Sequence, residues 1–136
     1  IAVGEIFRRL AGKCICAVTA DTARGLLQPH QFDVARPGGV ERIVHKMRDI
    51  IRDHWYDEDF AILKVDTKNA FNTPSRQAVM EECAIHFPEI FPWVNYCYMT
   101  HPILWHVLGT FLSAAGVQHG DPLETLIFAL AMHRLV

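Results

Sequence analysis

The sequence has no surplus of basic residues, no long apolar run and few cysteines, and each shortage argues against a class of protein. Its 136 residues hold 13 lysines and arginines against 15 acidic residues, which gives a formal net charge of -2. Proteins that bind nucleic acid usually carry a basic excess, so composition by itself argues mildly against such a partner. That objection weakens if basic surfaces lie in parts of the protein outside this sequence.

Two further shortages concern membranes and disulfides. The longest apolar run, Leu126–Met132, is far shorter than the roughly 18–20 residues that a membrane-spanning helix needs, so no membrane partner is expected. The four cysteines lack the spacing of a disulfide framework, which indicates a reduced, intracellular setting, cytoplasmic or nuclear. The chain begins without a methionine or a secretory signal pattern, so we expect it to be a segment of a longer protein. Its oligomeric state is left open.

The first half of the chain is predicted to be helical on either side of a loop. Apolar residues at helical spacing predict a short amphipathic helix over 5–20 and a second helix over 39–54 with one face in the core. His45 lies at the edge of that second apolar face and is expected to pack in the core rather than bind a metal. The proline and glycine breakers predict that 25–38 is mostly loop.

The second half mixes short strands with helices. The apolar, β-branched residues 60–65 predict a buried strand, and Thr73 is a plausible N-cap for a helix with Pro74 at its first position. The predicted elements are the strand at 60–65, helices at 74–86 and 89–100, a hairpin of 103–108 with 110–115, and a last helix capped by Asp121-Pro122. The fold class is therefore α+β, helix-rich with a short buried strand and a hairpin.

Two segments carry residues suited to chemistry. Asp66 directly follows the predicted strand, where a fixed carboxylate could hold Mg²⁺ or Mn²⁺, although the spacing alone favours a simple turn cap. The run 116–123 places glycines before a helix, and such glycines let a backbone approach a ligand while free amides attract anions. Taken alone, this run is better explained as an ordinary tight turn followed by an Asp-Pro helix cap.

Together and in this order, the two segments resemble motifs of a known family. Lys64–Asn72 resembles motif A of reverse transcriptases, in which an aspartate is followed by four residues and a phenylalanine. Gly116–Phe128 resembles motif B, and Ile1–Leu10 resembles the fingers segment that the family usually begins with Arg-Pro-Ile. With motif A at about 62–73 and motif B at about 116–130, the likeness covers nearly the whole chain. It is strongest to the non-LTR retroelement and group II intron-like branch.

This resemblance implies a partial reverse transcriptase domain over 1–136, with the fingers and the N-terminal part of the palm of a right-hand polymerase. Such an RNA-directed DNA polymerase extends a primer by phosphoryl transfer with two Mg²⁺ or Mn²⁺ ions. The implied partners are an RNA template, a DNA primer and dNTPs. The implied roles are catalysis by Asp66, metal binding by Asp66 and the Thr67 carbonyl, nucleotide binding by Phe71, Gln118, His119 and Gly120, and template contact by Arg8, Arg9 and Lys13.

Some of these residues also have a purely structural explanation. Without the resemblance, Phe71 is a plain core aromatic and the three basic residues are ordinary solvated side chains.

The sequence also departs from the family pattern. His119 stands where the family usually has glutamine, and Glu124-Thr125 stands where Ser-Pro or Gly-Pro is common, which adds a negative charge. The family's triphosphate-binding arginine would fall just before Ile1. The family's second catalytic motif, Tyr/Phe-x-Asp-Asp, does not occur before Val136.

One carboxylate cannot hold two divalent cations, so this chain alone is expected to be inactive. The palm sheet would lack the hairpin that pairs with 60–65, so low stability or aggregation is expected. The alternative function is a non-catalytic retroelement relic or an interaction module that retains part of the fold.

Overall fold

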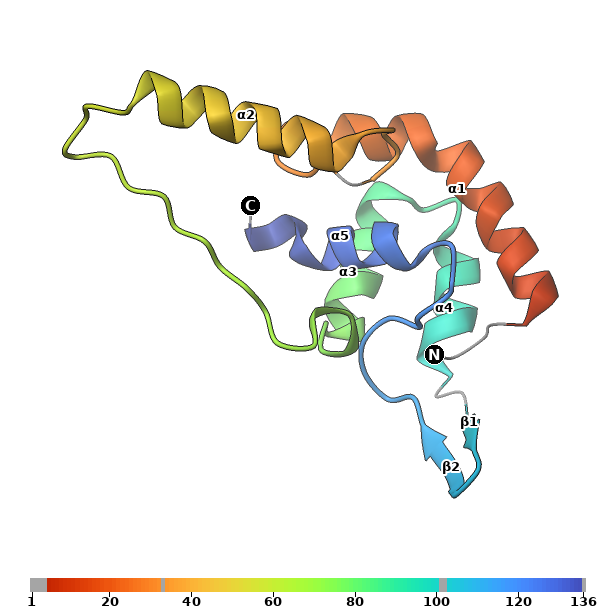
Figure 1. Cartoon of the computed structure of the whole chain (residues 1–136). Helices are drawn as coiled ribbons and strands as arrows, with labels where there is room; N and C mark the ends of the chain where they lie inside the picture. Colours follow the sequence, from red (N-terminus) through yellow and green to blue (C-terminus); the bar gives the residue numbers. More distant parts are fainter. Residues whose placement is uncertain (1–4, 33, 101–102, 136) are drawn as a thin grey trace.

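Five α-helices and one two-stranded sheet follow one another along residues 5–32, 34–100 and 103–135, the part of the chain that this computed structural model describes (Figure 1). The predicted fingers segment 1–10 is therefore described only from residue 5. The elements are α1 Ile6–Leu27, α2 Gly39–Asp53, the 3-10 turn η1 Ala70–Asn72, α3 Arg76–His86, α4 Phe91–Met99, β1 Ile103–His106, β2 Gly109–Leu112, α5 Glu124–Met132 and the 3-10 turn η2 His133–Leu135. The helix-rich composition with a small antiparallel sheet agrees with the predicted α+β class. Within these residues, no helix combines the length and apolar character needed to cross a membrane.

Helix α1 is longer than the sequence pattern predicted. It begins after Glu5, whose carboxylate accepts hydrogen bonds from the backbone N–H groups of Phe7 and Arg8 at 3.3 and 2.9 Å. It continues past residue 20 to Leu27 and ends where Gln28, the residue before Pro29, adopts an extended backbone. The clash between a proline ring and the preceding residue disfavours helix at that position, which explains the end point.

Helix α3 begins two residues later than predicted. Thr73 was expected to be its N-cap, but the side chain of Ser75 takes that role and accepts the backbone N–H of Ala78 at 3.3 Å. The hydroxyl of Thr73 instead donates backward to the carbonyls of Asn69 and Ala70. The predicted end at His86 is confirmed, just before Phe87 and a proline.

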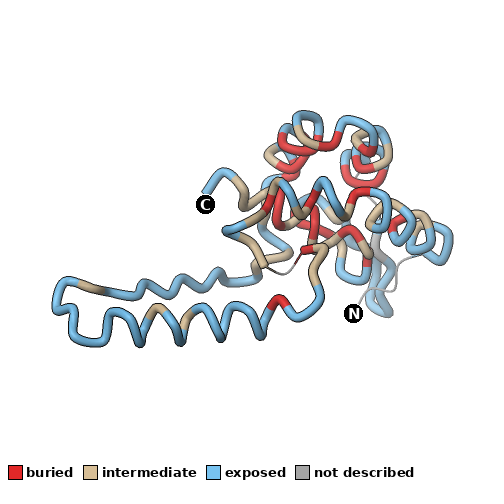
Figure 2. Tube along the Cα trace, turned by 90° about the horizontal axis from the view of Figure 1, so that it is seen from above, coloured by how far each residue is buried: buried red, intermediate tan, exposed pale blue. Residues whose placement is uncertain are grey.

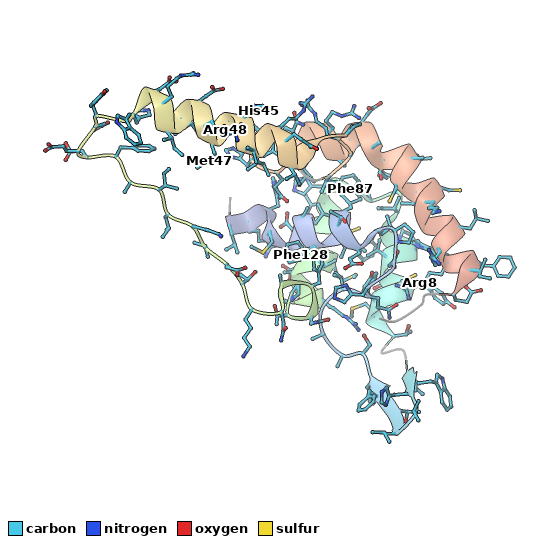
Figure 3. The ribbon with its side chains drawn as sticks, viewed as in Figure 1. Arg8, His45, Met47, Arg48, Phe87 and Phe128 are labelled. Atoms are coloured by element: carbon cyan, nitrogen blue, oxygen red, sulfur yellow. The ribbon has the colours of Figure 1, made fainter. Side chains whose placement is uncertain are left out.

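The buried core lies where α3, α4, α5 and the C-terminal half of α1 meet. Helix α3 packs on both α4 and α5, and α1 contacts α5. Figure 2 shows the buried residues gathered in this body of the molecule. The largest fully buried side chains come from these helices and the turns beside them, namely Tyr98, Phe87, Leu27, Leu123, Ile127 and Leu130. Figure 3 labels Phe87, which is fully buried, and Phe128, which is partly buried against this core.

The predicted hairpin is confirmed. Strands β1 and β2 are antiparallel, with Ile103 opposite Leu112 and His106 opposite Gly109. The turn is formed by Val107 and Leu108, and Gly109 begins the second strand with a φ of 142°. The hairpin projects away from the helical body (Figure 1).

Helix α2 and the segment 54–69 form an arm that extends from the body and is almost entirely exposed (Figure 2). Helix α2 was predicted correctly as a helix, but its apolar face does not enter the core, since Val40 is 65% exposed and Val44 is 43% exposed. His45 is likewise exposed on α2 rather than packed (Figure 3). The expectation that this face is buried is wrong, because no other described element covers it.

The segment 60–65 is extended but is not a buried strand. Leu63 and Val65 are 86% and 74% exposed. A β-strand needs a neighbour that accepts and donates its backbone hydrogen bonds, and within the described residues β1 and β2 pair only with each other. The prediction of a buried strand is therefore wrong for the chain as it stands.

This exposed arm leads to a prediction about solubility. Replacing Val44 with lysine is expected to reduce aggregation and to change the free energy of unfolding by less than about 0.5 kcal/mol, because the side chain touches little. Light scattering and urea unfolding measure the two effects. The matched control is Leu130→Lys on α5, which is fully buried and is expected to unfold the chain. Increased scattering of the Val44 variant would contradict the prediction.

Candidate functional site

The two segments that resemble polymerase motifs lie against each other. The backbone N–H of Val117 donates to the carbonyl of Phe71 at 2.7 Å, and that of Gly116 donates to the carbonyl of Pro74 at 3.2 Å. A Cβ atom on Gly116 would lie 2.5 Å from backbone atoms of Phe71 and Asn72, and its φ is +69°. Only glycine fits here, so the close approach that glycine permits is to the chain's own backbone.

Phe71 connects this contact to the core. Its ring centroid lies 4.7 Å from that of Phe128 on α5 and 5.5 Å from that of His119 in the loop. The side chain is half-buried and packs against the edge of the core. Three of the predicted nucleotide-binding residues, Phe71, His119 and Gly120, are therefore neighbours. Gln118 lies in the same loop, where its carbonyl accepts the N–H of Asp121.

Glu124 holds the loop from the first turn of α5. One carboxylate oxygen lies 2.7 Å from Nδ1 of His119, and the other accepts the backbone N–H of Gly120 at 2.9 Å. A carboxylate in the first turn of a helix is also favoured by the helix dipole. The sequence reasoning treated His119 and Glu124 as separate departures, and the structure brings them together as one pair.

Asp66 and Thr67 lie elsewhere, on the exposed part of the arm that leads to η1. Among the described residues, no group of three or more His, Cys, Asp and Glu side chains is close enough to hold a metal ion. The four cysteines are free, and burial raises the pKa of Cys83 to about 11, which leaves that thiol protonated at neutral pH. The side chains present thus offer a single carboxylate to a metal at this position.

Arg76 holds the segment that leads into the loop 116–120 through hydrogen bonds. From the start of α3 its guanidinium donates to the carbonyls of Gly116, Tyr98 and Ala115 at 3.0, 3.1 and 3.3 Å, and also to the carbonyl and hydroxyl of Ser113. The residue is buried. Burial lowers its pKa, and within the described part of the chain no carboxylate pairs with it. Arg76 therefore ties α3 and α4 to the segment that enters the loop.

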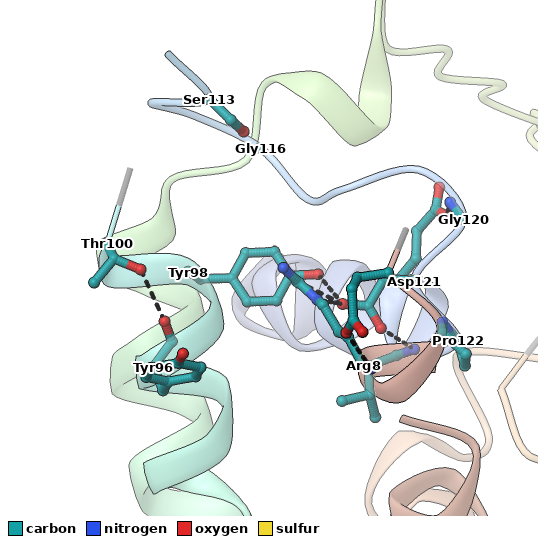
Figure 4. A network of polar contacts seen from close by, with 12 residues as sticks. Arg8, Tyr96, Tyr98, Thr100, Ser113, Gly116, Gly120, Asp121 and Pro122 are labelled. Atoms are coloured by element: carbon teal, nitrogen blue, oxygen red, sulfur yellow. Dashed lines mark hydrogen bonds and ion pairs between the residues drawn. The ribbon is translucent and has the colours of Figure 1, made fainter. Parts of the chain in front are cut away.

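A second buried group holds the other end of the loop (Figure 4). Asp121 accepts hydrogen bonds from Arg8 Nη2 and Nε at 2.7 and 3.1 Å and from the hydroxyl of Tyr98 at 3.0 Å. Its second oxygen accepts the N–H of Leu123 at 3.0 Å. Leu123 itself is the N-cap of α5 and no side chain caps the helix, so the predicted cap at Asp121-Pro122 lies too early in the chain. The guanidinium carbons of Arg8 and Arg76 lie 5.2 and 5.7 Å from the Tyr98 ring centroid. The network joins α1, α3 and α4 to the loop.

The charges in this network shift the pKa values of its members. Burial acts to lower the pKa of Arg8, but the hydrogen bond and the negative charge of Asp121 outweigh it and raise the pKa. Burial, followed by the charge of Asp121, raises the pKa of the Tyr98 hydroxyl above its ordinary range. Arg8 is therefore a fixed cation and Tyr98 a fixed donor at neutral pH.

The three basic residues predicted to contact template occupy different settings. Arg8 points from α1 toward α4 and the start of α5 (Figure 3), where Asp121 engages its guanidinium. Arg9 and Lys13 lie on α1 at the surface and line a shallow depression with Ile6 and Leu10. Template contact by all three stays a prediction, and the geometry favours it least for Arg8.

No polar role was predicted for Arg76, which donates to Ser113, Ala115 and Gly116, or for Tyr98, whose hydroxyl donates to Asp121. A signal for Arg76 was present, because it shares a helical face with Val79, Met80 and Cys83, which are all buried. An arginine on an apolar face is a candidate for a buried, fully hydrogen-bonded cation.

Comparison of the chain with protein-family models, curated proteins and solved structures finds no match in any of the three.

Proposed function

We propose that this chain is part of an RNA-directed DNA polymerase that extends a primer by phosphoryl transfer, and that it is inactive in isolation. The observation that carries the proposal is the contact between the segment 71–74 and the loop 116–120. Phe71 lies in the run that resembles motif A and Val117 in the run that resembles motif B, and the two are far apart in the sequence. Their contact supports the proposal, because both runs can bind one nucleotide only if they lie close together.

The local geometry supports a nucleotide-binding role for this contact. Phe71 is half-buried beside the loop, so its ring is held in place by Phe128 while one side remains near the surface. A bulky ring under the sugar would clash with a 2′-hydroxyl and favour deoxynucleotides. Arg76 and Asp121 hold the two ends of the loop by buried hydrogen bonds, which keeps its geometry fixed before any ligand arrives.

The described residues do not by themselves fit a pair of divalent ions. Asp66 is exposed, and no second or third carboxylate joins it within the described residues. Mg²⁺ is usually held by one or two carboxylates together with substrate phosphates and several waters, so a single exposed carboxylate does not provide for two such ions. No catalytic step is therefore derived for this chain on its own.

Primer extension tests the proposal directly. The 136-residue chain is expected to give no product on a primed RNA template with dNTPs, because it lacks the second carboxylate motif. A protein translated from a reading frame that continues through a Tyr/Phe-x-Asp-Asp motif is expected to extend the primer. Asp66→Ala should then lower the rate by about a thousandfold or more.

The matched control for that experiment is Asp59→Ala, which removes a carboxylate from the same exposed arm and should leave the rate unchanged. Product formed by the 136-residue chain, or an Asp66→Ala protein of parental activity, would each refute the proposed role.

A second function is favoured by the isolated position of Asp66. A non-catalytic relic or interaction module would keep the helical body and the loop contacts without needing a metal site. Sequencing the source DNA on both sides of this segment separates the two. An open frame with Arg-Pro upstream and Tyr/Phe-x-Asp-Asp downstream supports the polymerase, whereas stops or frameshifts close to Val136 support the relic.

A further inference from the structure

The apolar face of α2 has the spacing of a helix that packs against another helix. Val40, Ile43, Met47 and Ile50 recur three and four residues apart, which are the a and d positions of a heptad pattern. Val40 is 65% exposed and Ile43 is 41% exposed, and the other two are only partly buried. Helix α2 also reaches away from the helical body (Figure 1), so a second molecule can approach this face.

The two flanks of the apolar face differ in character. Val44 and Ile51 occupy equivalent positions of the heptad on one flank, and Lys46 and Asp53 occupy equivalent positions on the other. All four residues are exposed. One flank is therefore apolar along its length, whereas the other is positive near the start of α2 and negative at its end.

This pattern is self-complementary when two copies of α2 pack antiparallel. Each flank then faces the same flank of the partner in reverse order, which sets Lys46 opposite the partner's Asp53. On the other flank, Val44 lies opposite the partner's Ile51 in the same register. In a parallel pair the unlike flanks would meet, and Lys46 would face an apolar residue instead of a carboxylate. The charges therefore favour the antiparallel arrangement.

The contacts that these charged side chains make within the chain are at the surface. The ammonium of Lys46 lies 5.5 Å from the ring centroid of Phe32, and the carboxylate of Asp53 lies 3.3 Å from the guanidinium of Arg52. The side chains of Arg52 and Asp53 are 70% and 63% exposed. Exposed contacts of this kind contribute little to stability, so exchanging them for contacts with a second copy costs little.

We propose that two copies of this chain form a symmetric dimer through antiparallel α2 helices, in which Lys46 of each copy pairs with Asp53 of the other. The interface has two-fold symmetry, so this ion pair occurs twice. Because the interface is short, the expected Kd is roughly 10–100 µM. Unfolding measured well below that concentration reports on the monomer. The dimer does not depend on the proposed polymerase function.

Charge reversal of the 136-residue chain tests this pairing. Lys46→Asp and Asp53→Lys each place like charges opposite one another at both ion pairs, so each variant alone should dimerise about tenfold more weakly than the parent. An equimolar mixture of the two variants has opposite charges at both pairs and should form a heterodimer of parental affinity. Sedimentation equilibrium measures each protein alone, and a fluorescent label on one variant reports on the mixture.

Two further variants serve as controls. The chain with both substitutions, Lys46→Asp and Asp53→Lys, again has opposite charges at each pair and should dimerise like the parent, which guards against a folding defect in either single variant. Arg48→Asp reverses an exposed charge outside both flanks of the apolar face and should change the Kd by less than about twofold. Circular dichroism confirms that each variant keeps its helices.

Three results would each overturn the proposal. A parent chain that stays monomeric up to about 500 µM would leave the apolar face to another segment of a longer protein or to a different partner. Single variants that associate as tightly as the parent would show a parallel or unspecific contact. A mixture of Lys46→Asp and Asp53→Lys chains that forms no heterodimer would refute the antiparallel register.

Discussion

Replacing Arg76 with methionine is expected to lower the free energy of unfolding by about 3–5 kcal/mol. Methionine replaces the unbranched, aliphatic part of the arginine side chain but donates no hydrogen bonds, so the carbonyls of Ser113, Ala115 and Gly116 lose their shared donor. A buried acceptor left without a partner costs roughly 1–3 kcal/mol, and access of water to the segment limits the sum. The loop 116–120 should lose its fixed position at the same time.

Chemical denaturation followed by circular dichroism measures the effect, with a fixed concentration of a stabilising osmolyte because the parent chain is expected to be marginally stable. The matched control is Arg52→Met on α2, where the arginine is 70% exposed and pairs with Asp49 and Asp53. Loss of such exposed pairs should cost less than about 0.5 kcal/mol. An Arg76→Met protein as stable as the Arg52→Met protein would rule out this role.

Asp121→Asn is expected to cost about 3 kcal/mol, although the two side chains have nearly the same shape. The substitution leaves the partly buried guanidinium of Arg8, whose side chain is 17% exposed, without the counter-charge of Asp121, which is only 4% exposed and lies 2.7 Å from it. The hydroxyl of Tyr98 can still donate to the amide oxygen. Most of the loss in stability therefore comes from the Arg8 guanidinium that is left without a counter-charge. A second substitution, at Arg8, can test this origin of the loss.

Adding Arg8→Met to Asp121→Asn should cost less than Arg8→Met does in the parent, with a coupling energy of roughly 1–3 kcal/mol. The control pair is Asp21–Arg24 on α1, which is closer at 2.6 Å but has Asp21 92% exposed. Asp21→Asn should cost less than about 1 kcal/mol. Equal costs for Asp121→Asn and Asp21→Asn would show that burial does not govern these ion pairs.

Local patterns in the sequence were sufficient to predict most helices, because the features that start and stop a helix lie within a few residues. The end of α3 at His86 and the hairpin around Gly109 follow from signals of that kind. The start of α3 was missed because Thr73 and Ser75 both have capping side chains, and only the backbone geometry selects Ser75. This error stays within one turn, whereas α1 runs seven residues past its predicted end at residue 20.

The larger errors involve partners far away in the sequence. The apolar run 60–65 and the face of α2 that includes Val44 have the composition of buried elements, but burial depends on what another part of the protein places against them. Arg76 was missed for a related reason. Apart from the hydroxyl of Ser113, its acceptors are backbone carbonyls, which every residue has, so no side-chain pattern marks them.

The candidate site likewise contains one part that was predicted and one that was not. The resemblance placed Phe71 and His119 in one site, and the structure brings them within 5.5 Å between ring centroids. The role of Glu124 was not foreseen, because an added negative charge was judged in isolation. Its two partners, Nδ1 of His119 and the N–H of Gly120, depend on the turn that leads into α5.

The hydrogen bond between Phe71 and Val117 has a consequence for the order of folding during synthesis. Helices α3 and α4 and the hairpin all lie between its two ends, so the contact cannot form until the chain has been translated past residue 117. The α3–α4 pair is local and can assemble earlier on the emerging chain, with little loss of chain entropy. Closing Phe71 onto Val117 is therefore a late, high-contact-order step, and a ribosome paused before Gly116 would hold a chain with formed helices and an open site.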